Sequence, residues 1–163
     1  KSYLLFIGRM HAQKNPKFLN KIYELINSSF QGFQLIILGR GWDKDFFDSD
    51  SNNLVIYDQK ENVFDFLKYA SCLLFTSKFG EGYPNVIAEA MAVGTPIIGF
   101  DTGDYKKMTK NYKLAKTVNA EHEFIKQLEI IIKSNPKISK IDHEKILKEL
   151  NFDLTVNDYV KLI

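Results

Sequence analysis

The chain has 163 residues, which suits one domain with a buried core and leaves no room for two domains of ordinary size. Its 22 basic and 20 acidic side chains nearly balance, which argues against a nucleic-acid binder that depends on bulk charge. The single cysteine, Cys72, excludes an internal disulfide, and no apolar run reaches the roughly 18 residues of a membrane span. Cys72 itself lies in an apolar run, so we expect a buried, inert thiol.

Short apolar runs alternate with longer stretches of helical periodicity, a pattern typical of an α/β fold with a parallel sheet. The first run, 3–7, ends at Gly8 and precedes a helix over 15–27, whose apolar residues recur at three- and four-residue spacing. The pattern then predicts, in chain order, strand 33–38, strand 53–57, helix 62–70, strand 73–76, helix 84–93, strand 96–100, strand 114–118, and helices 121–133, 143–150 and 153–163.

Several of these strands end in a glycine or a polar loop. Ligands of open parallel sheets bind at the carboxyl ends of the strands, so these loops are the candidate site. They are residues 8–15, 39–42, 57–61, 77–85 and 101–104.

The loop after the first strand carries two cations five residues apart, Arg9 and Lys14. Both can converge on a diphosphate, arginine through its planar fork and lysine as a point charge. Two solvated surface cations are the alternative. The next loop, at Gly39-Arg40-Gly41, either allows close backbone approach to a ligand or forms an ordinary turn, and it lacks the third glycine of the dinucleotide fingerprint.

The segment 81–91 is the most informative part of the sequence. Glu81 follows a buried strand, Gly82 leaves the backbone open, and Pro84 begins a helix whose free N–H groups suit a phosphate. Glu89 lies about 7.5 Å further along the helix axis than Pro84. The two carboxylates can each accept hydrogen bonds from a diol, with a diphosphate between them and the two cations of the first loop offsetting the charge. Alternatively, Glu81 is a helix N-terminal charge and Glu89 a surface residue.

Five segments, in order and at the expected spacing, resemble glycosyltransferase family 4, the retaining enzymes with the two-domain GT-B fold. They are Gly8-Arg9 with Lys14-Asn15, 37–41, 69–77, 81–92 and 94–98. The resemblance implies that residues 1–163 form a Rossmann-like three-layer α/β domain with a mostly parallel sheet, the C-terminal half of a GT-B fold. It also implies that the N-terminal acceptor domain is absent, so this half binds the donor without completing the transfer.

The resemblance assigns a role to each matching residue. Arg9 and Lys14 would bind the donor diphosphate and stabilise the leaving group, and with Glu81, which would contact the transferred sugar, they form the expected catalytic set. Glu89 would hold the ribose hydroxyls, and residues 57–61 would flank the base. The other expected donor-binding positions are Gly8, Gly39, Tyr57, Gly82, Tyr83, Pro84 and Asn85.

The implied substrates are a UDP-, GDP- or ADP-sugar and a glycan or lipid-linked acceptor, with no cofactor, metal or nucleic acid. We expect a cytoplasmic protein, with peripheral contact at the inner face of the membrane as an open alternative. Two other functions stay open: a sugar-nucleotide epimerase of related fold, and a nucleotide-binding module without catalysis.

The sequence departs from the family after the fifth strand, where many relatives carry two glycines and a glutamate. Here the residues are Thr102-Gly103-Asp104-Tyr105, followed by a basic stretch over 106–116. A solvated face is the expected role of that stretch, and contact with an anionic membrane or a phosphorylated acceptor is the alternative. Trp42 lines the base pocket or packs in the core. The three histidines, His11, His122 and His143, lack metal-ligand spacing and are expected to be solvated or packed.

Overall fold

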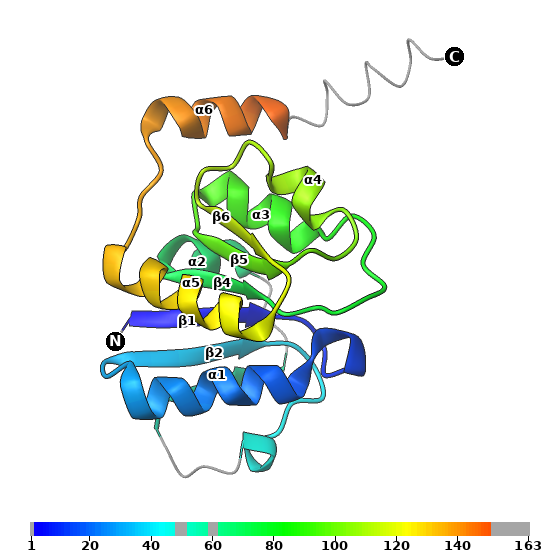
Figure 1. Ribbon diagram of the computed structural model, residues 1–163, viewed down its shortest axis with the longest axis vertical. Helices are drawn as coiled ribbons and strands as arrows, with labels where there is room; N and C mark the ends of the chain where they lie inside the picture. The colour runs from blue at the N-terminus through cyan, green and yellow to red at the C-terminus, as the bar shows by residue number, and fades with distance from the viewer. Residues whose placement is uncertain (1, 48–51, 59–61, 151–163) are drawn as a thin grey trace.

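The computed structural model describes residues 2–47, 52–58 and 62–150. Its strands form one six-stranded sheet in the order β3-β2-β1-β4-β5-β6, and every neighbouring pair is parallel (Figure 1). This confirms the predicted parallel α/β sheet. The strands are β1 (Ser2–Ile7), β2 (Phe33–Leu38), β3 (Leu54–Tyr57), β4 (Cys72–Phe75), β5 (Ile97–Phe100) and β6 (Ala115–Val118).

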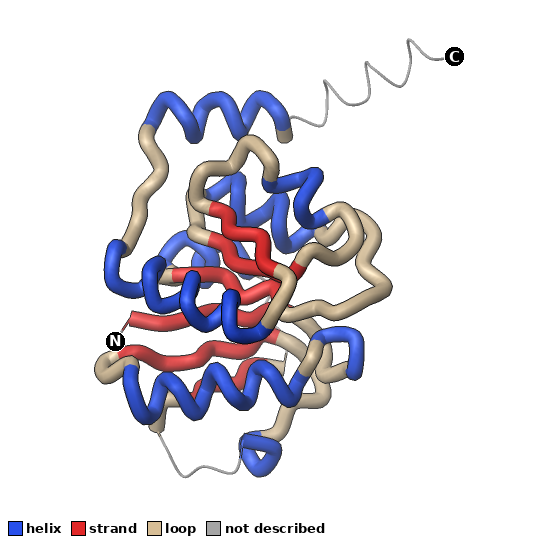
Figure 2. The backbone as a smooth tube through the Cα atoms, in the orientation of Figure 1, coloured by secondary structure: helices blue, strands red, loops and turns tan. Residues whose placement is uncertain are grey.

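Helices cover both faces of the sheet, which gives the predicted three layers (Figure 2). One face packs against α1 (Pro16–Ser29) and α5 (Glu121–Ser134), and the other against α2 (Val63–Tyr69), α3 (Asn85–Val93) and α4 (Tyr105–Thr109). On this second side, α6 (Lys140–Glu149) packs on α3 (Figure 1). Two short 3₁₀ segments are Ala12–Lys14 and Lys44–Phe47.

The predicted helices agree with the observed ones to within a few residues. α6 begins three residues before the predicted His143, because Ser139 caps it by accepting a hydrogen bond from Asp142 N at 3.1 Å. The predicted helix 153–163 lies outside the described residues. The sequence pattern did not predict α4 or the two 3₁₀ segments, which are shorter than the window over which helical periodicity can be read.

The core follows from the alternation of side chains along each strand. Leu4 and Phe6 point to the α1 and α5 side, whereas Leu5 points to the side of α2 and α3, and all three are buried. Cys72 is fully buried on the first side, which confirms the predicted burial, and burial raises the pKa of its thiol, which disfavours the reactive thiolate. Trp42 also packs on that side, with its ring 5.3 Å from the Phe6 ring, so it belongs to the core.

The unpredicted helix α4 is held by an aromatic stack. The Tyr105 ring lies 5.1 Å from the Phe75 ring at an interplanar angle of 9°, and its hydroxyl donates to Lys116 O at 3.0 Å. Gly99 makes room for this stack, because a Cβ there would lie 2.7 Å from Tyr105 Cζ. One buried aromatic residue therefore fixes a helix whose other side chains are mostly polar or exposed.

The first two loops at the carboxyl edge pack directly on each other. Gly8 N donates to Leu38 O at 2.9 Å, and Trp42 Nε1 donates to Gly8 O at 2.8 Å. A Cβ on Gly39 would overlap that same Gly8 carbonyl. The close approach at Gly39 is thus between two loops of the protein, and its contact with a ligand stays a prediction.

Replacing Gly39 with alanine should therefore destabilise the fold. We expect Gly39→Ala to lower the free energy of unfolding by about 1–3 kcal/mol, because the added methyl group overpacks two backbones. Gly82→Ala is the matched control, since a Cβ there meets open space, and it should change stability by less than about 0.5 kcal/mol. Urea unfolding measures both, and equal stabilities of the two variants would contradict the proposed overlap.

Candidate functional site

The strand order brings two candidate loops side by side. β1 pairs with β2 on one side and with β4 on the other, so the connections that leave β1 and β4 run to opposite faces of the sheet. Ligands of open α/β sheets bind at such a point. Two hydrogen bonds tie the loops together: Lys78 N donates to Gln13 O at 2.9 Å, and Thr76 Oγ1 donates to Lys14 O at 2.6 Å.

Lys14 and Glu81, which are 67 residues apart in the sequence, form an ion pair across these loops. Lys14 Nζ lies 2.5 Å from Glu81 Oε1, and the two side chains are only 18% and 11% exposed. The ammonium also lies 5.9 Å from the centre of the Phe75 ring, and a Cβ on Gly8 would press on the lysine stem. The alternative of a solvated surface cation is therefore wrong for Lys14.

A buried hydroxyl completes the pair. Ser77 Oγ donates to the same carboxylate oxygen, Glu81 Oε1, at 2.6 Å. Ser77 is 1% exposed, and Thr102 Oγ1 donates to its backbone carbonyl at 2.9 Å. Sequence reasoning placed Ser77 and Thr102 in candidate loops but gave them no role. The signal that could have found them is a hydroxyl residue two positions after a fully buried strand, since β4 ends at Phe75 and β5 at Phe100.

The loop that departs from the family supports the Glu81 loop. Gly103 adopts a left-handed φ of +59°, and a Cβ there would overlap the Glu81 carbonyl. Asp104 N donates to Gly82 O at 3.3 Å. Together with the bond from Thr102 to Ser77, these contacts give the segment 102–104 a structural role beneath the candidate site.

Arg9 differs from Lys14. It lies two residues after β1, it is exposed, and it forms no ion pair within the residues that the structure describes. Both of its interpretations, diphosphate ligand and solvated cation, therefore stay predictions. On the other side, Tyr57 ends β3 and its ring lies 5.5 Å from the Phe66 ring, whereas residues 59–61 of the expected base-flanking loop lie outside the described residues.

Helix α3 begins at Asn85, one residue later than predicted, with the buried Pro84 as its N-cap. No side chain caps this end, so N–H groups of the first turn stay available, and Gly82, Tyr83 and Asn85 are exposed beside it. Glu89 lies on the second turn, on the same face as Asn85. Its carboxyl is partly buried, and desolvation raises its pKa.

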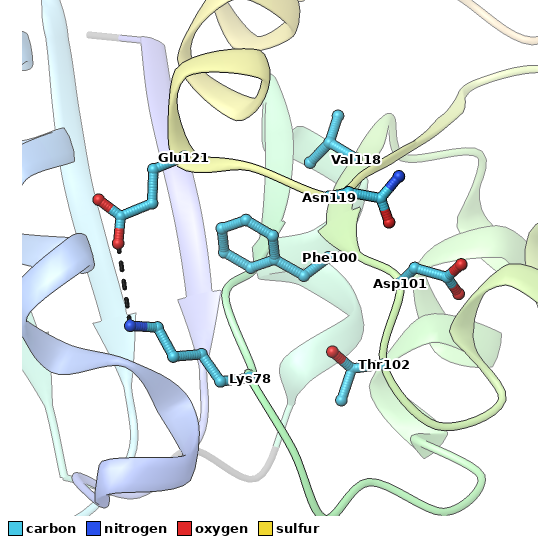
Figure 3. A pocket seen from close by; sticks show the side chains of 7 residues that line it. All are labelled: Lys78, Phe100, Asp101, Thr102, Val118, Asn119 and Glu121. Carbon is cyan, nitrogen blue, oxygen red and sulfur yellow. Dashed lines mark ion pairs between the residues drawn. The ribbon is translucent and has the colours of Figure 1, made fainter.

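A pocket of about 350 Å³ opens at the same edge of the sheet (Figure 3). It lies at the ends of β5 and β6 and at the start of α5. Lys78 and Glu121 form an ion pair at 3.9 Å on one side of it, the Phe100 ring lies beside this pair, and Thr102 lies on the other side. Thr102 therefore belongs both to this pocket and to the support of Ser77. The sequence pattern did not predict this pocket.

Two histidines have structural partners. His11 Nδ1 accepts a hydrogen bond from Gln13 N at 3.3 Å within the first loop, and His143 Nε2 lies 2.8 Å from Ala92 O, a contact between α6 and α3. In the basic stretch, Lys106 pairs with Asp101 and Lys113 with Asp142, in agreement with the expected solvated face. Within the described part of the chain, no helix is long and apolar enough to cross a membrane.

A family model for glycosyl transferases of group 1 matches residues 1–134. The chain belongs to this family. It is 33% identical over 101 residues to an uncharacterised glycosyltransferase of Methanocaldococcus jannaschii, a match that covers 58% of this chain and 25% of that protein. It is 26% identical over 144 residues to one of Haemophilus influenzae, covering 83% of this chain and 40% of the relative. The chain thus spans between a quarter and two fifths of the length of these two relatives.

Solved structures share the fold of this group 1 domain. TarM superposes with a TM-score of 0.82 at 17% identity, covering 99% of this chain and 34% of TarM. Sucrose-phosphate synthase from Thermosynechococcus elongatus superposes with a TM-score of 0.77 at 15% identity, covering 99% of this chain and 44% of the synthase. At such identities the likeness concerns the fold, and it supports the predicted Rossmann-like architecture.

The raised pKa of Glu89 gives this glycosyltransferase domain a testable pH dependence. Between the unfolded and folded pKa values the folded state binds more protons, so the stabilisation from a neutral carboxyl is present at low pH and is lost as pH rises through the folded value. Glu89→Gln should therefore be more stable than the wild type at pH 7, with a gain that shrinks as pH falls toward 4.

Urea unfolding of both proteins at pH 7 and pH 4 measures this difference. Asp142→Asn is the matched control with the opposite sign, because hydrogen bonds from Lys113 and Ser139 lower the pKa of that carboxyl. A Glu89→Gln variant that is less stable than the wild type at pH 7 would contradict the account of Glu89 as a desolvated carboxylate.

Proposed function

We propose that this group 1 glycosyltransferase domain is the donor-binding, C-terminal half of a retaining family 4 enzyme that transfers a sugar from a nucleoside diphosphate sugar. The observation that carries the proposal is the contact between Lys14 and Glu81 where the loops after β1 and β4 meet. Both residues were expected at a donor site from the sequence, and the fold places them against each other at the edge where open parallel sheets bind ligands.

In the proposed reaction, the bond between the anomeric carbon and the phosphate oxygen breaks, and the acceptor hydroxyl oxygen bonds to that carbon and passes its proton to the leaving phosphate oxygen. Negative charge grows on the leaving diphosphate. Lys14, Arg9 and the uncapped start of α3 would stabilise this charge, because preorganised cations and N–H groups act most strongly where charge develops. These groups supply positive charge without a metal, so we propose a metal-independent transfer.

Glu81 and Glu89 would bind hydroxyl groups on either side of the diphosphate. Glu81 is held near Lys14 and would contact the transferred sugar. Glu89, partly buried on α3, would hold the ribose. A carboxylate whose burial disfavours its charged form lowers stability, and such a cost is common at functional sites.

The acceptor would be a glycan or a lipid-linked saccharide bound mainly by an N-terminal half. Among the structural neighbours, WaaG is a glycosyltransferase involved in lipopolysaccharide biosynthesis, and AviGT4 one involved in avilamycin A biosynthesis. The chain covers 41% and 50% of these two proteins, which leaves room for such a half. The transferase names of both curated relatives favour transfer over the epimerase and over a non-catalytic module.

Donor binding is the direct test. We expect titration calorimetry to show micromolar-range binding of a UDP-, GDP- or ADP-sugar, and at least about tenfold weaker binding by Arg9→Ala and by Glu89→Ala, because each loses a charge-assisted hydrogen bond. Lys126→Ala, which removes an exposed cation from the middle of α5, should bind like the wild type. No heat of binding with any of these nucleotide sugars at millimolar concentration would refute the proposal for this domain.

A further inference from the structure

Two donors share one oxygen of Glu81. Lys14 Nζ lies 2.5 Å from Oε1 and Ser77 Oγ lies 2.6 Å from it. The donors differ in freedom of movement, because lysine carries its charge on a flexible four-carbon stem, whereas the serine hydroxyl is attached directly to Cβ. Ser77 is also 1% exposed, which leaves its hydroxyl little room to turn away.

The backbone at Ser77 is held from two sides. Thr102 Oγ1 donates to its carbonyl at 2.9 Å, and the preceding residue, Thr76, donates to Lys14 O at 2.6 Å. Thr76 and Ser77 are buried although they are polar, and their hydroxyl groups all find acceptors at this edge. The backbone that carries the Ser77 hydroxyl is therefore held by bonds that do not involve the lysine ammonium.

Donor binding would take Lys14 away from Glu81. If the ammonium turns to the diphosphate, a carboxylate that is only 11% exposed loses its cation. Leaving one partner of a buried pair uncompensated is strongly destabilising, so the bound state needs another donor for this oxygen. The Ser77 hydroxyl already occupies that position.

We propose that Ser77 is a positioning residue that holds the Glu81 carboxylate in place while Lys14 moves from Glu81 to the donor diphosphate. The inference rests on the proposed function, because it requires Lys14 to bind that diphosphate. Ser77 acts through Glu81 and does not touch the donor. The hydrogen bond from Ser77 stabilises the Glu81 carboxylate more in the bound state than in the free protein, because in the free protein Lys14 also binds this carboxylate.

A double-mutant cycle tests this. Titration calorimetry with the nucleoside diphosphate and the nucleotide sugar that the wild type binds best compares Ser77→Ala, Glu81→Ala and the double variant. Ser77→Ala should weaken binding about tenfold, as expected for losing a hydrogen bond to a charged group. In the Glu81→Ala background, the same substitution should change affinity less than about twofold, because no carboxylate is left to hold.

Thr95→Val is the matched control, since it removes a buried hydroxyl bond to a backbone carbonyl, that of Leu67, and leaves Glu81, its two donors and the supports of Ser77 intact. It should lower the unfolding temperature and change nucleotide affinity less than about twofold. If Ser77→Ala does not fold, Ser77→Cys keeps the side-chain volume with a weaker donor and should show a smaller loss of the same sign.

The outcomes separate the two proposals. If the wild type binds no nucleotide, both proposals are refuted. If the wild type binds the nucleotide and Ser77→Ala binds it with equal affinity, only this inference is refuted. An equal loss from Ser77→Ala in the wild-type and Glu81→Ala backgrounds would also overturn it, because the effect would then be a general structural one.

Discussion

The pairing of β1 with both β2 and β4 determines where charged groups can meet in this molecule. Parallel strands bring their carboxyl ends to one edge, and the chain leaves β1 and β4 toward opposite faces of the sheet. The loops after these strands therefore lie together without helices between them. Lys14 and Glu81 can pair across 67 residues of sequence only because this topology is in place. The positions of Ser77, the start of α3 and the segment 102–104 follow from the same edge.

Two residues at the carboxyl edge of the sheet lower the stability of the fold. Asn15, which caps α1, has a left-handed φ of 55°, and its buried Nδ2 has no hydrogen-bond partner among the described residues. Glu89 carries a carboxyl whose burial disfavours its charge. Strained backbone and uncompensated polar groups persist where the surrounding structure holds them, and they gather at functional sites. Here the hydrogen bonds donated by the hydroxyl groups of Thr76, Ser77 and Thr102 hold the loops of this edge in place.

Most strands could be predicted from the sequence because both faces of the sheet are buried, which turns central strands such as β4 and β5 into continuous apolar runs, whereas the edge strand β6 keeps the exposed Lys116 and Thr117. The placement of Lys14 and Glu81 at one edge was predictable too, since a parallel sheet aligns strand ends whatever their order, but their contact also required β4 to pair with β1. The roles of Ser77 and Thr102 were not, because a hydroxyl's partner depends on side-chain contacts between loops. Trp42 illustrates the same limit. Its position beside Gly41 in the sequence was compatible with a base pocket and with the core. Its contacts with the Phe6 ring and the Gly8 carbonyl show that it belongs to the core.

Phe75 shows how the departure from the family pattern is absorbed. As the last residue of β4, it stacks on Tyr105 and also lies near the Lys14 ammonium. Tyr105 is not exposed at the donor edge, because it is fully buried and anchors α4. By anchoring α4, it sets the segment 102–104 against the Glu81 backbone. The loop after β5 is thus connected to the lysine and the carboxylate through packing on Phe75 and on the Glu81 backbone, and no residue of that loop forms a hydrogen bond or ion pair with either side chain in the described part of the chain.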